Sequence, residues 1–179
     1  MRITLVLGTG RIGRVSEKVT SFVSKKVNEI QDVVLTFVDV AQYSYGRTIP
    51  PEEENEITKI WKKIAFESEA FIFVVPEYNH GFPGELKILL DSAFEEYSRK
   101  PLLLITLSDG PWGGARMSEH LKPILQNLGL IVMSRVLHTA NADKMFENGG
   151  PSQDYSMQLE NLLRELVEYG NDLNTIRKV

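Results

Sequence analysis

Short apolar runs alternate with longer amphipathic segments from one end of the chain to the other. A short apolar run predicts a strand, and apolar residues that recur at three- and four-residue spacing predict a helix. The predicted strands are Ile3 to Leu7, Val33 to Val38, Ala70 to Val75, Leu102 to Leu107 and Leu130 to Leu137. The predicted helices carry their apolar stripes over Val15 to Ile30, Ile57 to Ile64, Leu86 to Ala93, Met117 to Leu128 and Leu159 to Tyr169, and a loop is predicted over Asn141 to Ser152.

The third predicted strand indicates the fold class. Ala70 to Val75 is apolar at every position, as expected when both faces of a strand are covered. Five strands that alternate with five helices predict an α/β fold, with a parallel sheet and helices on both faces. Neither a linker nor an internal repeat divides the 179 residues, so we expect a single domain over 1–179. For this length, a flavodoxin-like five-stranded parallel sheet is a natural candidate.

Charge and composition narrow the possible partners. The chain has 20 Lys and Arg against 24 Asp and Glu, mixed along its length, which gives no indication of nucleic acid or of an anionic membrane. No run approaches the roughly 18 apolar residues of a spanning helix. The absence of cysteine excludes disulfides, thiol nucleophiles and cysteine–zinc sites, and three scattered histidines predict no metal site. We expect a cytoplasmic protein.

The loop after the first strand has the composition of an anion site. Its candidate binding residues are Gly8, Thr9, Arg11, Gly13, Arg14, Val15 and Ser16. Hydroxyl and guanidinium donors suit a terminal phosphate monoester. Two other interpretations stay open. Gly8 to Gly13 also matches the dinucleotide fingerprint G-x-G-x-x-G, with Asp39 placed where a ribose-binding acid would stand. Alternatively, Ser16 only caps the following helix and the arginines are solvated.

A second loop, Pro76 to Lys87, follows the third strand and reads PEYNHGFPGELK. Pro76 lacks an N–H and ends the strand, and Pro83 stands where a helix would begin. Between them lie tightly turning residues with backbone amides that we expect to be free, and one flat aromatic side chain, Tyr78. Composition alone would also fit an ordinary strand-to-helix loop.

A third loop, Ser108 to Gly114, follows the fourth strand. Its three glycines permit close approach of the backbone to a ligand, and Trp112 offers a stacking face. In the flavodoxin-like order, strands one, three and four are neighbours, so the three loops should line one crevice at their carboxyl ends. The first loop suits a phosphate, and the other two suit a flat heterocycle.

Together these motifs resemble the NADPH-dependent FMN reductase family, which includes azoreductases and chromate or quinone reductases. The family's first loop has the form G-S/T-x-R followed by a serine, and its second reads P-E-Y-N-x-x-x-P-G-x-L-K, which Pro76 to Lys87 matches position by position. Two features depart from it: Lys18 stands where many members have Asn, and Asp109 to Trp112 replaces a Ser- or Thr-rich turn.

The resemblance implies FMN as cofactor and NADPH or NADH as hydride donor. The first loop would hold the FMN phosphate, chiefly through Thr9, Arg11, Arg14 and Ser16. The isoalloxazine ring would be bordered by Pro76, Glu77, Tyr78 and Asn79, largely through backbone. Its other side would be covered by Ser108, Asp109 and Gly110. No side chain is assigned a catalytic role, because the flavin carries the hydride chemistry.

The implied enzyme passes hydride to a second small-molecule acceptor, such as a flavin, quinone, azo compound or metal oxyanion, by a ping-pong mechanism. The resemblance also implies a homodimer or homotetramer. Two alternatives remain: an electron carrier without turnover, and a nicotinamide dinucleotide-binding Rossmann module. Electron carriers are usually strongly acidic, so a net charge of −4 argues mildly against the first. The second would need a substrate domain for which the chain has no room.

Overall fold

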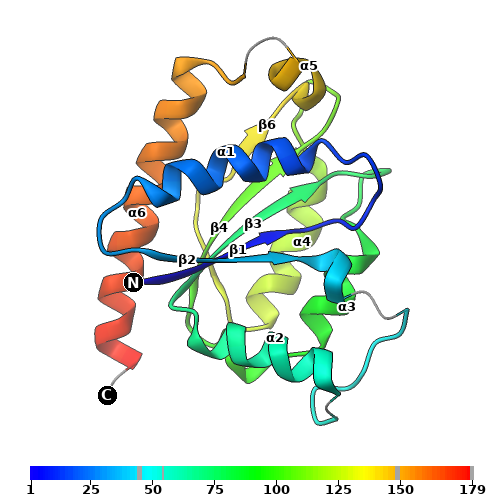
Figure 1. Cartoon of the computed structure of the whole chain (residues 1–179), viewed down its shortest axis with the longest axis vertical. Helices are drawn as coiled ribbons and strands as arrows, with labels where there is room; N and C mark the ends of the chain where they lie inside the picture. Colours follow the sequence, from blue (N-terminus) through cyan, green and yellow to red (C-terminus); the bar gives the residue numbers. More distant parts are fainter. Residues whose placement is uncertain (44–45, 54, 148–149, 178–179) are drawn as a thin grey trace.

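A parallel sheet lies between two layers of helices in the computed structural model, which describes residues 1–43, 46–53, 55–147 and 150–177 (Figure 1). The four long strands are β1 (Arg2–Leu7), β2 (Val34–Asp39), β3 (Ala70–Pro76) and β4 (Pro101–Leu107). Two short strands, β5 (Ile131–Val132) and β6 (Leu137–Thr139), both pair with β4. The strand order β2-β1-β3-β4-β5 is the flavodoxin-like order, so the predicted fold class is confirmed.

The fifth strand differs from its prediction. The sequence predicted one strand over Leu130 to Leu137, whereas β5 pairs with β4 from Pro101 and β6 pairs with β4 up to Leu107. Between the two short strands the exposed Arg135 turns to the surface and pairs with Glu165, Nη2 to Oε2 2.5 Å. A polar, solvated segment cannot continue a strand that is covered on both faces. The fifth position of the sheet is therefore filled by two pieces.

Helices cover both faces of the sheet, as predicted (Figure 1). The helices on one face are α1 (Ser16–Asn28), α5 (Ala142–Glu147) and α6 (Gln153–Arg177). Those on the other face are α2 (Glu56–Glu67), α3 (Gly84–Asp91) and α4 (Ala115–Asn127), with two 3₁₀ turns, η1 (Val40–Tyr43) and η2 (Glu95–Tyr97). The alternation along β3 divides the core, since Phe71 and Phe73 pack on the second set and Ile72 and Val74 on the first.

Helix α5 lies within the segment Asn141 to Ser152, for which the sequence predicted a loop. Its Ala142 is fully buried against the core below α1 and α6. Six residues are too few for helical periodicity to appear in a sequence. Residues 148 and 149 of the same segment lie outside the described residues.

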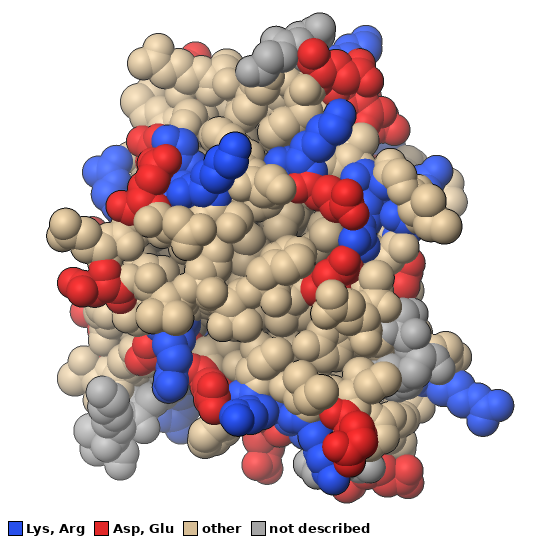
Figure 2. Space-filling model, in the orientation of Figure 1, with Lys and Arg blue, Asp and Glu red and all other residues tan. Residues whose placement is uncertain are grey.

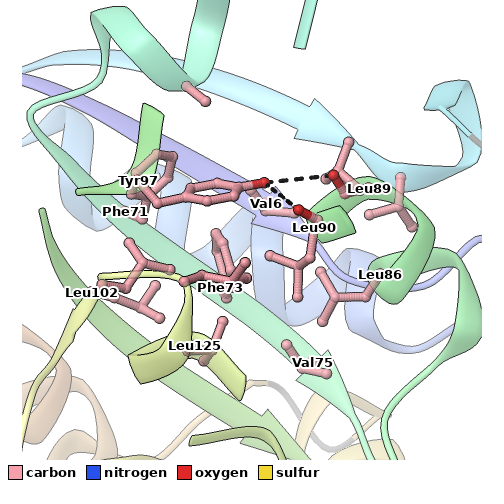
Figure 3. Packing of buried hydrophobic residues seen from close by; sticks show 14 of the residues in the cluster. Val6, Phe71, Phe73, Val75, Leu86, Leu89, Leu90, Tyr97, Leu102 and Leu125 are labelled. Atoms are coloured by element: carbon pink, nitrogen blue, oxygen red, sulfur yellow. Dashed lines mark hydrogen bonds between the residues drawn. The ribbon is translucent and has the colours of Figure 1, made fainter. Parts of the chain in front are cut away.

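The core on the α2 side is built around aromatic rings. Trp61 of α2 is fully buried, and its Nε1 donates to the hydroxyl of Tyr97 over 2.9 Å. Figure 3 shows the Tyr97 hydroxyl pointing at the carbonyl oxygens of Leu89 and Leu90, to which it donates over 3.5 and 3.2 Å. These bonds link α2, α3 and η2 across the apolar layer that covers β3 and β4.

Acidic and basic side chains are interspersed on the face shown in Figure 2, around a central uncharged area. The arrangement agrees with the mixed charge pattern of the sequence and offers no extended patch of one sign on that face. In the ranges described, none of the helices combines the length and apolarity that crossing a membrane requires.

Candidate cofactor site

The carboxyl ends of β1, β3 and β4 lie next to one another in the sheet, and the three predicted loops surround a pocket there. The strand register places Leu7 beside Val74, and Pro76 beside Leu107. Of the predicted residues, those that line the pocket are Arg11, Gly13, Arg14, Val15, Ser16, Pro76, Glu77, Tyr78, Ser108 and Asp109. The predicted residues that do not line the pocket are Gly8, Thr9, Asn79 and Gly110. The loops therefore meet at one place.

The base of the first loop is fixed against β3. Gly8 donates its N–H to the carbonyl of Val74 over 2.9 Å, and a Cβ at Gly8 would lie 3.0 Å from that same oxygen. Thr9 is fully buried, and its Oγ1 accepts from the backbone N–H of Arg11 over 3.3 Å. Gly8 and Thr9 fix the conformation of the loop through these contacts, and the segment from Arg11 to Ser16 faces the pocket.

Ser16 is the strongest sign of a ligand in this loop. It is 1% exposed and opens α1, yet its Oγ has no hydrogen-bond partner. The helix has Val15 at its N-cap, with no side-chain cap, so the interpretation of Ser16 as a simple cap is wrong. A buried hydroxyl without a partner is uncommon in a folded protein. At the start of α1, where the helix dipole favours an anion, this hydroxyl fits a phosphate oxygen.

Arg14 is held by the protein itself. Its guanidinium forms a two-pronged pair with Asp39, Nη1 to Oδ1 2.9 Å and Nη2 to Oδ2 2.5 Å, and it also contacts Glu17 and the carbonyl of Thr9. Burial acts to lower the pKa of Arg14, but hydrogen bonds to Asp39 and Glu17 outweigh it and raise that pKa. With both carboxylate oxygens engaged, Asp39 is poorly placed to bind a ribose, which weighs against the dinucleotide interpretation.

Arg11 is the cation that faces outward. Its side chain is exposed, and its guanidinium carbon lies 5.0 Å from the ring centroid of Tyr78. This distance permits a cation–π contact, which orients the guanidinium over the pocket wall. In the part of the chain that the structure describes, no salt bridge engages Arg11.

The second loop is a tight two-residue turn. Tyr78 and Gly81 exchange both backbone hydrogen bonds over 2.9 Å, and Asn79 and His80 between them are left-handed, with φ of 51° and 64°. Positive φ at both central positions defines a type I′ turn. The N–H groups of Tyr78 and Gly81 bond to each other's carbonyls, and the N–H of Glu77 bonds to Leu107. The expectation of free amides is therefore wrong for these three residues.

The Glu77 side chain also forms a hydrogen bond within the protein. Its Oε2 accepts from the backbone N–H of Met117 over 3.0 Å. This bond joins the second loop to the start of α4. Pro83 is the N-cap of α3, with φ of −63° and ψ of 141°, so the helix begins one residue later, at Gly84. The loop thus presents Pro76 and the side chain of Tyr78 to the pocket.

Two of the glycines in the third loop serve packing. A Cβ at Gly113 would lie 2.8 Å from the backbone nitrogen of Thr139, and one at Gly114 would lie 2.8 Å from Thr106. Both have positive φ, of 56° and 86°. The prediction that all three glycines serve approach to a ligand is therefore wrong for these two. Trp112 is 65% exposed and does not line the pocket.

Asp109 lines the pocket beside Asp143, a residue that the sequence did not single out. Burial raises the pKa of Asp109, and the charge of Asp143 adds to the rise, while Arg11 opposes it. Asp143 belongs to α5, which follows the last strand. The loop after that strand reaches the same edge of the sheet as the other three, so the topology could have pointed to it.

The family model of NADPH-dependent FMN reductase matches residues 1–144. The chain belongs to this family. It is accordingly an enzyme, an NAD(P)H-dependent flavoprotein oxidoreductase whose cofactor is FMN. Membership favours this reading over the electron carrier and over the Rossmann module.

Curated relatives and a solved structure agree with the family. An NAD(P)H-dependent FMN reductase of Saccharomyces cerevisiae is 24% identical over 153 residues, which are 76% of this chain and 79% of that protein. A quinone reductase of Pseudomonas putida is 30% identical over 145 residues, covering 78% of this chain and 73% of that protein. The fold is similar to that of a flavoenzyme NAD(P)H:(acceptor) oxidoreductase from Paracoccus denitrificans, with a TM-score of 0.80 and 19% identity over 96% of this chain and 97% of that one.

Proposed function

We propose that the pocket at the ends of β1, β3 and β4 holds FMN, and that the enzyme passes hydride from NADPH or NADH to a second small-molecule acceptor by a ping-pong mechanism. The observation that carries the proposal is the unpartnered, buried Oγ of Ser16 beside the exposed cation Arg11. A hydroxyl donor, a guanidinium and a helix N-terminus together suit a phosphate monoester. The flavin supplies the hydride chemistry once bound.

The proposed orientation follows from the charge of the loops. The phosphate would lie at Arg11 to Ser16, where α1 begins. The flat ring would lie between Pro76 and Tyr78 on one side and Ser108 to Gly110 on the other. Asn79 stands at the exposed tip of its turn, so its contribution would come through the position of the loop. Arg14 would support the phosphate indirectly, by fixing the loop through Asp39.

Steady-state kinetics test the proposed mechanism. The purified protein should show flavin absorption and should oxidise NADPH or NADH continuously when a quinone or an azo dye is present. Because both substrates would use one face of the flavin in turn, plots with both concentrations varied should give parallel lines. Intersecting lines would require a ternary complex and would overturn the ping-pong mechanism. A protein that is reduced once and then stops would instead behave as a carrier.

Loss of the Arg11 guanidinium should weaken binding of FMN specifically. A hydrogen bond to a charged group is worth about 1.5–3 kcal/mol, so Arg11→Ala should raise the Kd for FMN about ten- to a hundredfold. Riboflavin lacks the phosphate, so its Kd should change little. Quenching of flavin fluorescence measures both constants on protein freed of flavin.

The matched control for Arg11 is Arg164→Ala, which removes the same charge from the exposed face of α6, away from the pocket. It should leave both constants unchanged. An equal loss of FMN and riboflavin affinity in Arg11→Ala would place the phosphate elsewhere.

Other expectations remain predictions. A homodimer or homotetramer is proposed from the family resemblance. A single FMN-binding domain over 1–179 is proposed from the chain length, and a cytoplasmic location from the absence of cysteine. Size-exclusion chromatography with light scattering would measure the oligomeric state directly.

A further inference from the structure

Two buried side-chain atoms in the described ranges have no hydrogen-bond partner, Ser16 Oγ and Asp143 Oδ1, and both residues line the same pocket. A buried polar atom left without a partner costs free energy, so such atoms are rare unless something binds them. Ser16 is accounted for by the proposed phosphate. Asp143 requires a different partner, since a carboxylate can only accept hydrogen bonds.

The segment that carries Asp143 is held between the third loop and helix α1. The two residues before Asp143 bond to the third loop, with the N–H of Ala142 donating to Ser108 and the N–H of Asn141 to Gly110, both over 3.1 Å. On its other side, α5 packs on α1, where the rings of Phe146 and Phe22 lie 6.4 Å apart, edge to face. Asp143 therefore lines the same pocket as Ser16 of the proposed phosphate end and Ser108 of the proposed ring end.

The neighbouring charges exclude the phosphate itself as the partner. Asp143 lies close enough to Asp109 for the two carboxyl groups to interact, and a phosphate monoester would add more negative charge to them. The partner must instead be a group that donates a hydrogen bond to the carboxylate. Between its phosphate and its ring, FMN carries a ribityl chain, whose hydroxyl groups are such donors.

We propose that Asp143 Oδ1 accepts a hydrogen bond from a ribityl hydroxyl and so fixes the chain that joins phosphate to ring. The inference rests on the proposed function. It makes Asp143 a specificity-determining residue, because the contact selects flavins that carry a polyol side chain. In the structure Asp143 Oδ1 is buried without a hydrogen-bond partner, and a hydroxyl donor from the ligand would remove the cost of that one atom.

Binding of three flavins to the full chain, freed of its cofactor, tests the inference. FMN carries ribityl chain and phosphate, riboflavin carries the chain alone, and lumiflavin carries neither. In Asp143→Ala the Kd of both FMN and riboflavin should rise by the same factor, about tenfold or more, and that of lumiflavin should not change. The control, Glu147→Ala, removes an exposed carboxylate from the same helix and should leave all three constants as they were.

Thermal unfolding of the flavin-free protein supplies a second readout. A residue that only supports the fold would lower the midpoint when removed, whereas removal of an unsatisfied carboxylate should leave it unchanged or raise it. An unchanged Kd for riboflavin, an equal loss with lumiflavin, or tighter binding of FMN would each overturn the inference. If the parent binds FMN and only the Asp143 effect is missing, this inference alone fails. If the parent binds no flavin, the proposed function fails with it.

Discussion

Trp61→Ala should lower the free energy of unfolding by about 3–5 kcal/mol, the cost that truncation of a buried aromatic side chain usually carries. Trp61 is fully buried, and its ring lies within 6.2–6.3 Å of those of Tyr43, Phe71 and Tyr97. The substitution also removes the hydrogen bond from Nε1 to the Tyr97 hydroxyl. Urea denaturation followed by circular dichroism measures the loss.

The neighbouring Ile60 provides the control, since it is 55% exposed on the same helix. Ile60→Ala should change the free energy of unfolding by no more than about 0.5 kcal/mol. Because Trp61 does not line the pocket, Trp61→Ala should still bind FMN with the parent affinity under conditions where it stays folded. If Trp61→Ala were about as stable as the parent, the neighbouring aromatic side chains would have to repack into the cavity left by the indole ring, and the prediction would be wrong.

The sheet was predictable where burial on both faces makes a strand continuously apolar. Ala70 to Val75 and Leu102 to Leu107 have that pattern, and β3 and β4 form within one residue of those limits. The segment after Leu130 is interrupted by Ser134 and Arg135. A local pattern cannot reveal that Arg135 pairs with Glu165, because the two residues are 30 positions apart in the sequence.

The composition of the first loop predicted an anion site, but it could not show which of the two arginines faces the pocket. Nothing in the sequence separates Arg11 from Arg14, yet Arg11 is exposed while Arg14 is half-buried and paired with Asp39. That difference depends on how closely β2 approaches the loop in space. Ser16 was one of the predicted binding residues, and its burial and unpartnered Oγ favour a ligand-binding hydroxyl over a helix cap.

In the third loop, two glycines were assigned to the ligand but serve the packing of the protein itself. Gly113 and Gly114 were interpreted as room for a ligand, and the structure uses that room for the backbone of residues 138–140 and for Thr106. A glycine in a sequence can indicate that another group approaches its backbone closely. Only the fold shows whether that group is a ligand or another part of the protein. Asp143 was not predicted from the sequence for a related reason. Its place in the pocket depends on a six-residue helix, which is too short to show a helical period.

One glycine inserted between Glu77 and Tyr78 should abolish FMN binding while the fold survives. The insertion lengthens the chain by about 3.8 Å between consecutive Cα atoms, which moves Tyr78 out of its place in the pocket wall. Its contacts with Arg11 and with the hydroxyl of Thr9 would be lost as well. Each of these contacts depends on the position of the Tyr78 ring, so FMN affinity should fall by more than about a hundredfold.

The fold should survive this insertion because the elements on either side are fixed independently. The N–H of Glu77 stays bonded to Leu107, and the turn from Tyr78 to Gly81 is closed by its own two hydrogen bonds. Circular dichroism would report the fold, and flavin fluorescence the binding. A glycine inserted between Arg47 and Thr48, in an exposed loop outside the pocket, controls for chain lengthening and should leave binding intact. If the variant with the longer second loop folds and binds FMN as tightly as the parent, that loop does not border the flavin ring.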